Sequence, residues 1–257
     1  MTSVEPIDAD RLIERLRVEA ETLAATVDAA DPSALAAPVP GAPGLTMGEV
    51  TRHVGSIYRM TWHWIREGGR PADWRRDPAA HQTLTGYVRA GATALLAELN
   101  GHEPDEPCAT WLPSDQTYRF WRRRMAHEST VHRIDVQNAA GAPISDIPQD
   151  IAVDGIDEAL HLWFTHRLAV LGVTGTRRGL VAVRAAGYQW LAHAGPHGTS
   201  VDRLEPGRSA EPDAVVSGSA TQVYLWLWGR VSDRQVRHSG NQDAIAQLWA
   251  LLRLGMR

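Results

Sequence analysis

The amino-acid sequence changes character at residues 172–176. Before this segment, apolar residues recur every three or four positions in several long runs, which is the spacing of amphipathic helices. After it, short apolar and β-branched runs are separated by glycines, a pattern typical of strands and turns. A chain of 257 residues is long enough for two hydrophobic cores. We therefore predict an α+β protein, with a helical domain over residues 1–171 and a smaller α+β domain over residues 172–257.

Five helices are expected in the first domain. The expected ranges are residues 8–30, 46–67, 82–99, 117–140 and 148–171. Thr46 and Glu49 form a capping-box pattern at the start of the second helix, and Gly68 marks its end. Because the connections are short, the sequence favours an antiparallel bundle with one crossover.

The second domain is expected to combine strands with two helices. Strands are predicted at residues 180–185, 188–192 and 214–217, where apolar and β-branched residues are bounded by turn residues. Helices are predicted at residues 219–228 and 241–254. This mixture predicts a small α+β fold.

Composition limits the classes of partner. The net charge of −4, with acidic and basic residues intermixed, gives no general attraction to nucleic acid or to anionic lipid. A single cysteine, Cys108, excludes an internal disulfide and favours a reducing compartment. Neither a signal-peptide pattern nor a run of membrane-spanning length is evident. We expect a cytoplasmic protein that acts on small molecules, without a membrane or nucleic-acid partner.

Residues 127–135, with the sequence HESTVHRID, contain the main candidate for chemistry. Glu128 and His132 are four residues apart in a predicted helix, so both lie on one face and can share an ion. The string is similar to the H-E-x-x-H motif of zinc proteases, but Val131 stands where the second histidine would be needed. A protease of that type is therefore disfavoured.

A second histidine site changes the interpretation of this pair. His53 lies between Val50 and Ile57 on the apolar stripe of its predicted helix, so it should face the interior of the bundle. Together with Glu128 and His132 it would complete a His/Glu/His set, which is typical of a metal site with one open position. The spacing alone leaves two alternatives: a hydrogen-bonded carboxylate–imidazole pair or a bound metal ion.

Three segments carry a resemblance to a known family. Residues 125–135, residues 152–158 and the stretch from Pro43 to His53 resemble the mycothiol-dependent maleylpyruvate isomerase family. Members of that family join a DinB-like metal-binding helical bundle to a C-terminal domain related to sterol-carrier modules. The resemblance implies a divalent metal, usually zinc, held by His53, Glu128 and His132, and it implies mycothiol as the thiol cosubstrate.

Further residues are candidates for binding the cofactor. Arg133 and Asp135 follow the family motif, and Asp135 could orient a metal ligand or form an ion pair within its helix instead. Arg230, in the run LWLWGR, could close the cavity from the second domain, although a buried helix end is the more usual explanation of such a run. Four arginines precede the motif and could clamp a substrate carboxylate, although a charged run on a helix is usually a solvated face: Arg119, Arg122, Arg123 and Arg124.

The implied chemistry uses an external nucleophile, so no catalytic residue of the chain is assigned. A metal-held thiol would add to a small electrophile and either leave again after cis–trans isomerisation or remain attached in an S-transfer. Two other functions remain open at this point: a metal-dependent hydrolase, and a non-catalytic regulatory protein that binds metal.

Overall fold

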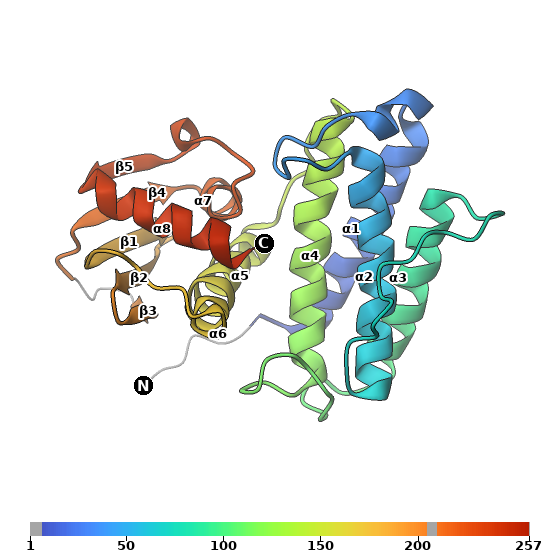
Figure 1. Cartoon of the computed structure of the whole chain (residues 1–257), viewed down its shortest axis with the longest axis horizontal. Coiled ribbons are helices and arrows are strands. Elements are labelled where there is room, and N and C mark those ends of the chain that lie inside the picture. The colour runs from blue at the N-terminus through green and yellow to red at the C-terminus, as the bar shows by residue number, and fades with distance from the viewer. Residues whose placement is uncertain (1–6, 205–209, 257) are drawn as a thin grey trace. The chain divides into compact units, whose positions relative to one another are not determined.

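The structure, a computed structural model, describes residues 7–204 and 210–256 and forms two compact units, residues 1–146 and 147–257 (Figure 1). The units divide well before residue 171, where the change in sequence character placed the boundary. The expected α+β class, with a helical bundle followed by a small α+β domain, is confirmed.

The first unit is a bundle of four long helices (Figure 1). These are α1 (Ala9–Ala29), α2 (Met47–Glu67), α3 (Leu84–Asn100) and α4 (Tyr118–Ala139), with a short 3-10 turn, η1 (Pro32–Ala36), between the first two. α1 packs against α3 and α4, and α2 packs against the same two helices. The bundle therefore places α2 and α4 side by side, which is what positions the candidate site.

Both ends of α2 are fixed by local sequence. The Thr46 side chain accepts from the backbone N–H of Glu49, and the Glu49 carboxylate accepts from the backbone N–H of Thr46, so the predicted capping box is present. At the other end Gly68 has a φ of 79°, a left-handed conformation that glycine adopts without steric cost.

The second unit begins with a continuous helical segment. It consists of α5 (Gln149–Glu158), a π-helical stretch η2 (Ala159–Arg167) and α6 (Leu168–Leu171). The sequence assigned this segment to the first domain as its fifth helix, and that assignment is not what the structure shows. η2 packs against β3 and α8, and α5 packs against α7, so the apolar face of the segment covers the second core.

A five-stranded sheet forms the rest of the second unit, with the order β3-β2-β1-β4-β5. Its strands are β1 (Gly179–Ala185), β2 (Tyr188–Gly195), β3 (Gly198–Leu204), β4 (Ala214–Gly218) and β5 (Arg237–Gly240), accompanied by α7 (Ala220–Leu227), a short η3 (Asp233–Gln235) and α8 (Gln242–Gly255). β1 pairs with β4 in parallel, and the other pairs are antiparallel. Sequence patterns missed β3 and β5 because these edge strands bury few side chains.

The β1–β2 hairpin shows how turn chemistry sets the register. Ala186 and Gly187 connect the two strands, with φ values of 49° and 82°. Positive φ at both central residues is the requirement of the tight hairpin turns whose twist matches that of the strands.

One further fold observation concerns membranes. Within residues 7–204 and 210–256, no helix has both the length and the apolar character needed to cross a bilayer.

Candidate metal centre

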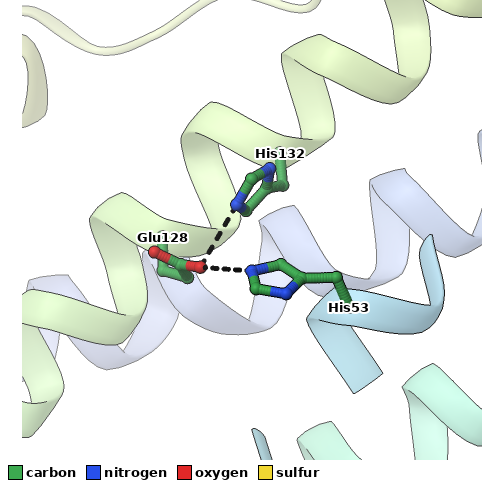
Figure 2. A group of neighbouring side chains, drawn as sticks. All are labelled: His53, Glu128 and His132. Carbon is green, nitrogen blue, oxygen red and sulfur yellow. Dashed lines mark hydrogen bonds and ion pairs between the residues drawn. The ribbon is translucent and has the colours of Figure 1, made fainter. Parts of the chain in front are cut away.

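Three side chains from two helices of the first unit converge on one point (Figure 2). His53 extends from α2, and Glu128 and His132 extend from α4. Their ligand atoms all lie within 4.8 Å of one another. The Nε2 atoms of His53 and His132 are 3.3 Å and 3.2 Å from the same carboxylate oxygen, Oε1 of Glu128. We refer to these three residues as the His/Glu/His cluster.

The helix geometry explains the convergence. Glu128 and His132 are one turn apart on α4, as their spacing predicted, and α2 packs directly against α4. His53 follows the apolar stripe that buries Val50, Val54 and Ile57, but its side chain is 31% exposed, so it sits at the border of the core. Glu128 and His132 each keep 15% exposure, so the cluster is partly exposed to solvent.

Charge is balanced within the cluster by Arg124. Its Nη2 donates to Oε2 of Glu128 at 2.5 Å. The other carboxylate oxygen, Oε1, is the one that faces the two imidazoles. Burial by itself would raise the pKa of Glu128, but the charges of His132 and Arg124 outweigh it and hold that pKa well below its usual range. The carboxylate is therefore ionised at neutral pH.

His132 is oriented by a second carboxylate, that of Asp135. The Nδ1 of His132 lies 3.0 Å from Oδ2 of Asp135, whose side chain is fully buried. Burial alone would lower the pKa of His132, but the Glu128 carboxylate and the contact with Asp135 raise it to about 9. A carboxylate that accepts from Nδ1 leaves Nε2 facing the cluster, as in many metal-bound histidines.

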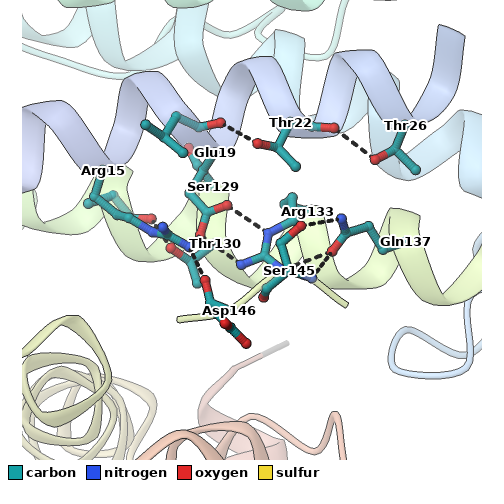
Figure 3. Close-up of polar contacts among 12 residues, drawn as sticks. Arg15, Glu19, Thr22, Thr26, Ser129, Thr130, Arg133, Gln137, Ser145 and Asp146 are labelled. Carbon is teal, nitrogen blue, oxygen red and sulfur yellow. Dashed lines mark hydrogen bonds and ion pairs between the residues drawn. The ribbon is translucent and has the colours of Figure 1, made fainter. Parts of the chain in front are cut away.

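Arg133 lies next to His132 in the chain but turns away from it, into a buried ionic network (Figure 3). Its Nε and Nη2 donate to the two carboxylate oxygens of Glu19 on α1 at 2.7 and 3.0 Å. Nη1 donates to the side chain of Gln137 and to the backbone carbonyl of Ser145. Arg133 is wholly buried, so the structure does not bring it to the His/Glu/His cluster as a cofactor-binding group.

The arginines at the start of α4 lie in different environments. Arg122 is buried and donates to Asp10 and to the backbone carbonyls of Leu99 and His102. Arg119 pairs with Asp105 at the surface. Arg124 contacts the cluster through Glu128, a role that its spacing of four residues from Glu128 could have indicated.

Sequence reasoning also missed Trp74. Its ring packs edge-on against the ring of His53, with centroids 5.9 Å apart. Trp74 lies in the connection between α2 and α3, which has no periodic pattern, so no signal in the sequence singled it out.

Arg230, the candidate from the second unit, contacts the backbone of its own unit. Arg230 follows α7, and its Nη1 donates to the backbone carbonyl of Trp228 at 2.7 Å. Trp226 is fully buried and donates to Asp233, so it is a core residue. The role of Arg230 toward a cofactor stays a prediction. In the first unit, burial raises the pKa of the Cys108 thiol to about 12, which makes it a poor nucleophile at neutral pH.

Comparison with known proteins gives a consistent result over both units. The mycothiol maleylpyruvate isomerase N-terminal domain matches residues 16–137, and the MDMPI C-terminal domain matches residues 150–247. No match was found among curated proteins.

Two solved structures share the fold. One is the crystal structure of the mycothiol-dependent maleylpyruvate isomerase, with 17% sequence identity and a TM-score of 0.62; the alignment covers 91% of this chain and 95% of that one. The other is a variant of that isomerase with one histidine replaced by alanine, with 16% identity, the same TM-score of 0.62 and the same coverage of 91% and 95%. With its two domains matched in order along the sequence, the chain belongs to the mycothiol-dependent maleylpyruvate isomerase family.

Proposed function

We propose that the protein is a mycothiol-dependent metalloenzyme that isomerises a small unsaturated electrophile, with His53, Glu128 and His132 as its metal ligands. The observation that carries the proposal is the convergence of the three ligand atoms within 4.8 Å at a partly exposed point of the bundle. The solved relative is a maleylpyruvate isomerase that depends on mycothiol, so maleylpyruvate is the first electrophile to test.

The donor set fits a divalent ion such as zinc. Zinc bonds to histidine nitrogen and carboxylate oxygen are about 2.0–2.1 Å long, which places neighbouring ligands of a tetrahedral ion about 3.4 Å apart. The two nitrogen–oxygen distances in the cluster are 3.3 and 3.2 Å. Two imidazoles and one carboxylate are borderline ligands that suit zinc, and three protein ligands leave a position for an exogenous group.

The residues around the cluster would serve this chemistry by holding the ligands in place. When bound, a divalent cation stabilises a coordinated thiolate over its thiol. Asp135 keeps Nε2 of His132 directed at the cluster, and Arg124 keeps the Glu128 carboxylate ionised and fixed. Trp74 packs against the His53 ring and limits its rotation.

Isomerisation places few other demands on the protein. Addition of a thiolate and a proton across an activated cis double bond creates a single bond, which can rotate before the same thiol and proton leave. The thiol is regenerated, so no residue of the chain needs to form a covalent bond. A substrate with a leaving group would instead retain the sulfur, which is the transferase outcome.

The test measures metal content and thiol-dependent isomerisation together. The purified protein should contain about one equivalent of metal and convert a cis substrate to its trans isomer only when mycothiol is present. His53→Ala should lose both properties, whereas His197→Ala, a change at an exposed histidine of the second unit, should keep both. Cleavage of a substrate by water without thiol would indicate a hydrolase, and metal binding without any turnover would indicate a non-catalytic role.

We also propose a cytoplasmic location, on the basis of the single cysteine and the dependence on a small intracellular thiol that the proposed reaction carries.

A further inference from the structure

A pocket of about 340 Å³ lies in the first unit, and its lining includes Trp74, the residue that packs against His53. It is formed by the second half of α2, by one face of α3 and by the connection between them, which runs back along α2 (Figure 1). Its walls include Trp62, Trp74 and Ala94. This volume is at the lower end of the range for small-molecule sites, so the pocket suits a compact ligand.

Arg59 gives the pocket its chemical character. Its Nη1 donates to the backbone carbonyls of Gly55 and Tyr87, both at 2.8 Å, and its guanidinium stacks over the Tyr87 ring at 3.7 Å. All of these partners are uncharged. Among the residues that the structure describes, no carboxylate lies within ion-pairing distance of Arg59, although nearby arginines on α2 have one: Arg52 pairs with Asp77, and Arg66 pairs with Glu98.

The remaining donors of Arg59 are the ones a ligand would use. Within residues 7–204 and 210–256, Nε and Nη2 of Arg59 make no hydrogen bond. Gly91 makes room for this arginine, because a Cβ atom there would come within 2.6 Å of Nη1. The fold therefore holds a guanidinium group in a pocket wall that also includes Asp73, without an ion pair among the described residues and with its Nε and Nη2 donors unused.

Trp74 connects this pocket with the cluster. The same indole that lines the pocket packs against the ring of His53, with centroids 5.9 Å apart. A ligand in the pocket could thus contact both Arg59 and the indole that packs against His53.

We propose that this pocket binds the electrophilic substrate as a small organic carboxylate, with its carboxylate on Arg59 and its flat unsaturated part against the indoles of Trp62 and Trp74. A guanidinium that makes no ion pair favours an anion, and two indole rings in the lining favour a small conjugated group over a sugar. The proposal rests on the proposed function, because it takes the occupant to be the substrate of that reaction.

Filling the pocket tests the proposal without touching the core. Ala94 is exposed on α3 and lines the pocket, so Ala94→Phe should occupy the space and raise the KM for the electrophile by about 10- to 100-fold, as expected when a charge-assisted contact is lost. Ala97→Phe is the matched control, because Ala97 is also exposed on α3 but lies outside the pocket. Metal content and the KM for mycothiol should stay unchanged in both variants.

Changing Arg59 tests the chemistry of recognition. Arg59→Met should raise the KM for the electrophile as much as Ala94→Phe does, and Arg59→Lys should recover part of the loss because the charge is kept. Since Arg59 also bridges α2 and α3, the thermal midpoint of each variant has to be measured alongside. Ala94→Phe keeps the test decisive if the Arg59 variants do not fold.

Failure of this proposal can be separated from failure of the proposed function. If the metal-loaded protein isomerises maleylpyruvate and Ala94→Phe leaves the KM for it within twofold of the parent, the pocket proposal is overturned and the proposed function stands. Calorimetric titration with maleate, a carboxylate that can be tested without a thiol, measures binding to the pocket independently of isomerase activity. Binding that is lost in Ala94→Phe but kept in Ala97→Phe supports the pocket even in a protein without isomerase activity.

Discussion

Helix α4 carries two ionic groupings on neighbouring faces, and they differ in how completely they are closed. Glu128 and His132 form one with His53, and the side chains keep 15–31% exposure. Arg133 and Gln137, also four residues apart, form the other with Glu19, and there Arg133 and Glu19 are 0% and 1% exposed. In the second grouping all of the Arg133 nitrogens are paired, whereas in the first the ligand atoms of three residues lie within 4.8 Å of one another at a partly exposed point.

This difference separates a structural network from a binding site on the same helix. Buried charges that satisfy one another contribute to the specificity of packing and leave nothing for a ligand. In the His/Glu/His cluster, Arg124 holds the Glu128 carboxylate and Asp135 holds the His132 imidazole. Charged and polar groups that are held in this way at a partly exposed point are arranged to receive a further group. The following predictions test this distinction, in order of expected size.

The largest effect is expected from opening the closed network. Glu19→Gln would leave Arg15 and Arg133 buried without their carboxylate, so the free energy of unfolding should fall by about 3–5 kcal/mol. Glu14→Gln on the same helix is the control, because its ion pair with Arg17 is exposed and should cost less than about 0.5 kcal/mol. Urea denaturation measures both, and a loss below 1 kcal/mol for Glu19→Gln would mean that the network is not structural.

Removing a metal ion from the His/Glu/His cluster should have a smaller effect on the free energy of unfolding. Removal of metal by a chelator should lower the free energy of unfolding by about 3 kcal/mol when the free ion had been at a hundredfold excess over its dissociation constant. The thermal midpoint then falls by several degrees, and adding zinc back restores it. His53→Ala should show no response to the chelator, and a response of the same size would place the ion elsewhere.

Asp135 lies at the border between the two groupings, because it is fully buried yet touches His132. Asp135→Asn keeps the shape but removes the charge behind the imidazole, so metal affinity should fall by about 10- to 100-fold. Competition with a chromophoric chelator gives the affinity. Asp105→Asn, at an exposed carboxylate, should leave it unchanged, and an unchanged affinity in Asp135→Asn itself would assign Asp135 to packing alone.

The smallest effect is expected from an ionic grouping at the surface. Arg89 pairs with Glu21 and Asp28, and its hydrogen bonds lower the pKa of both carboxyl groups. Because these pKa values are lower in the folded state, the stabilisation is present above pH of about 4 and is lost as the pH falls through the folded-state values.

Solvent screening limits this contribution, since all three side chains are more than a third exposed. Arg89→Met should therefore cost less than about 1 kcal/mol at pH 7 and nothing measurable at pH 2. High salt should reduce the difference at pH 7. A cost that persists at pH 2 would show that Arg89 acts through packing of its hydrocarbon chain instead.

The sequence predicted those parts of the site that depend on local spacing. Glu128 and His132 could be paired because both lie on one helix, and the capping box at Thr46 located the helix that bears His53. Placing His53 against them required the apolar stripe of α2 and the family resemblance, because 75 residues separate His53 from Glu128.

The remaining features depend on contacts between distant segments. Arg133 follows the motif, yet its partner Glu19 is 114 residues away, and no sequence pattern in either segment predicts the pairing. The helical segment before residue 171 has the same periodicity whether it covers the first core or the second, so its assignment to the wrong domain could be corrected only by its packing. Trp74 lies outside any helix or strand, so no periodic pattern in the sequence indicated its contact with His53.

The network in Figure 3 also affects how the end of the first unit can evolve. Arg15 donates to the main-chain oxygen of Asp146, and Arg133 donates to that of Ser145. Every amino acid provides such an oxygen, so substitutions at position 146 leave this attachment intact, whereas a change at either arginine removes it. The end of the first unit is therefore attached to the bundle through its backbone, whichever side chain stands at position 146.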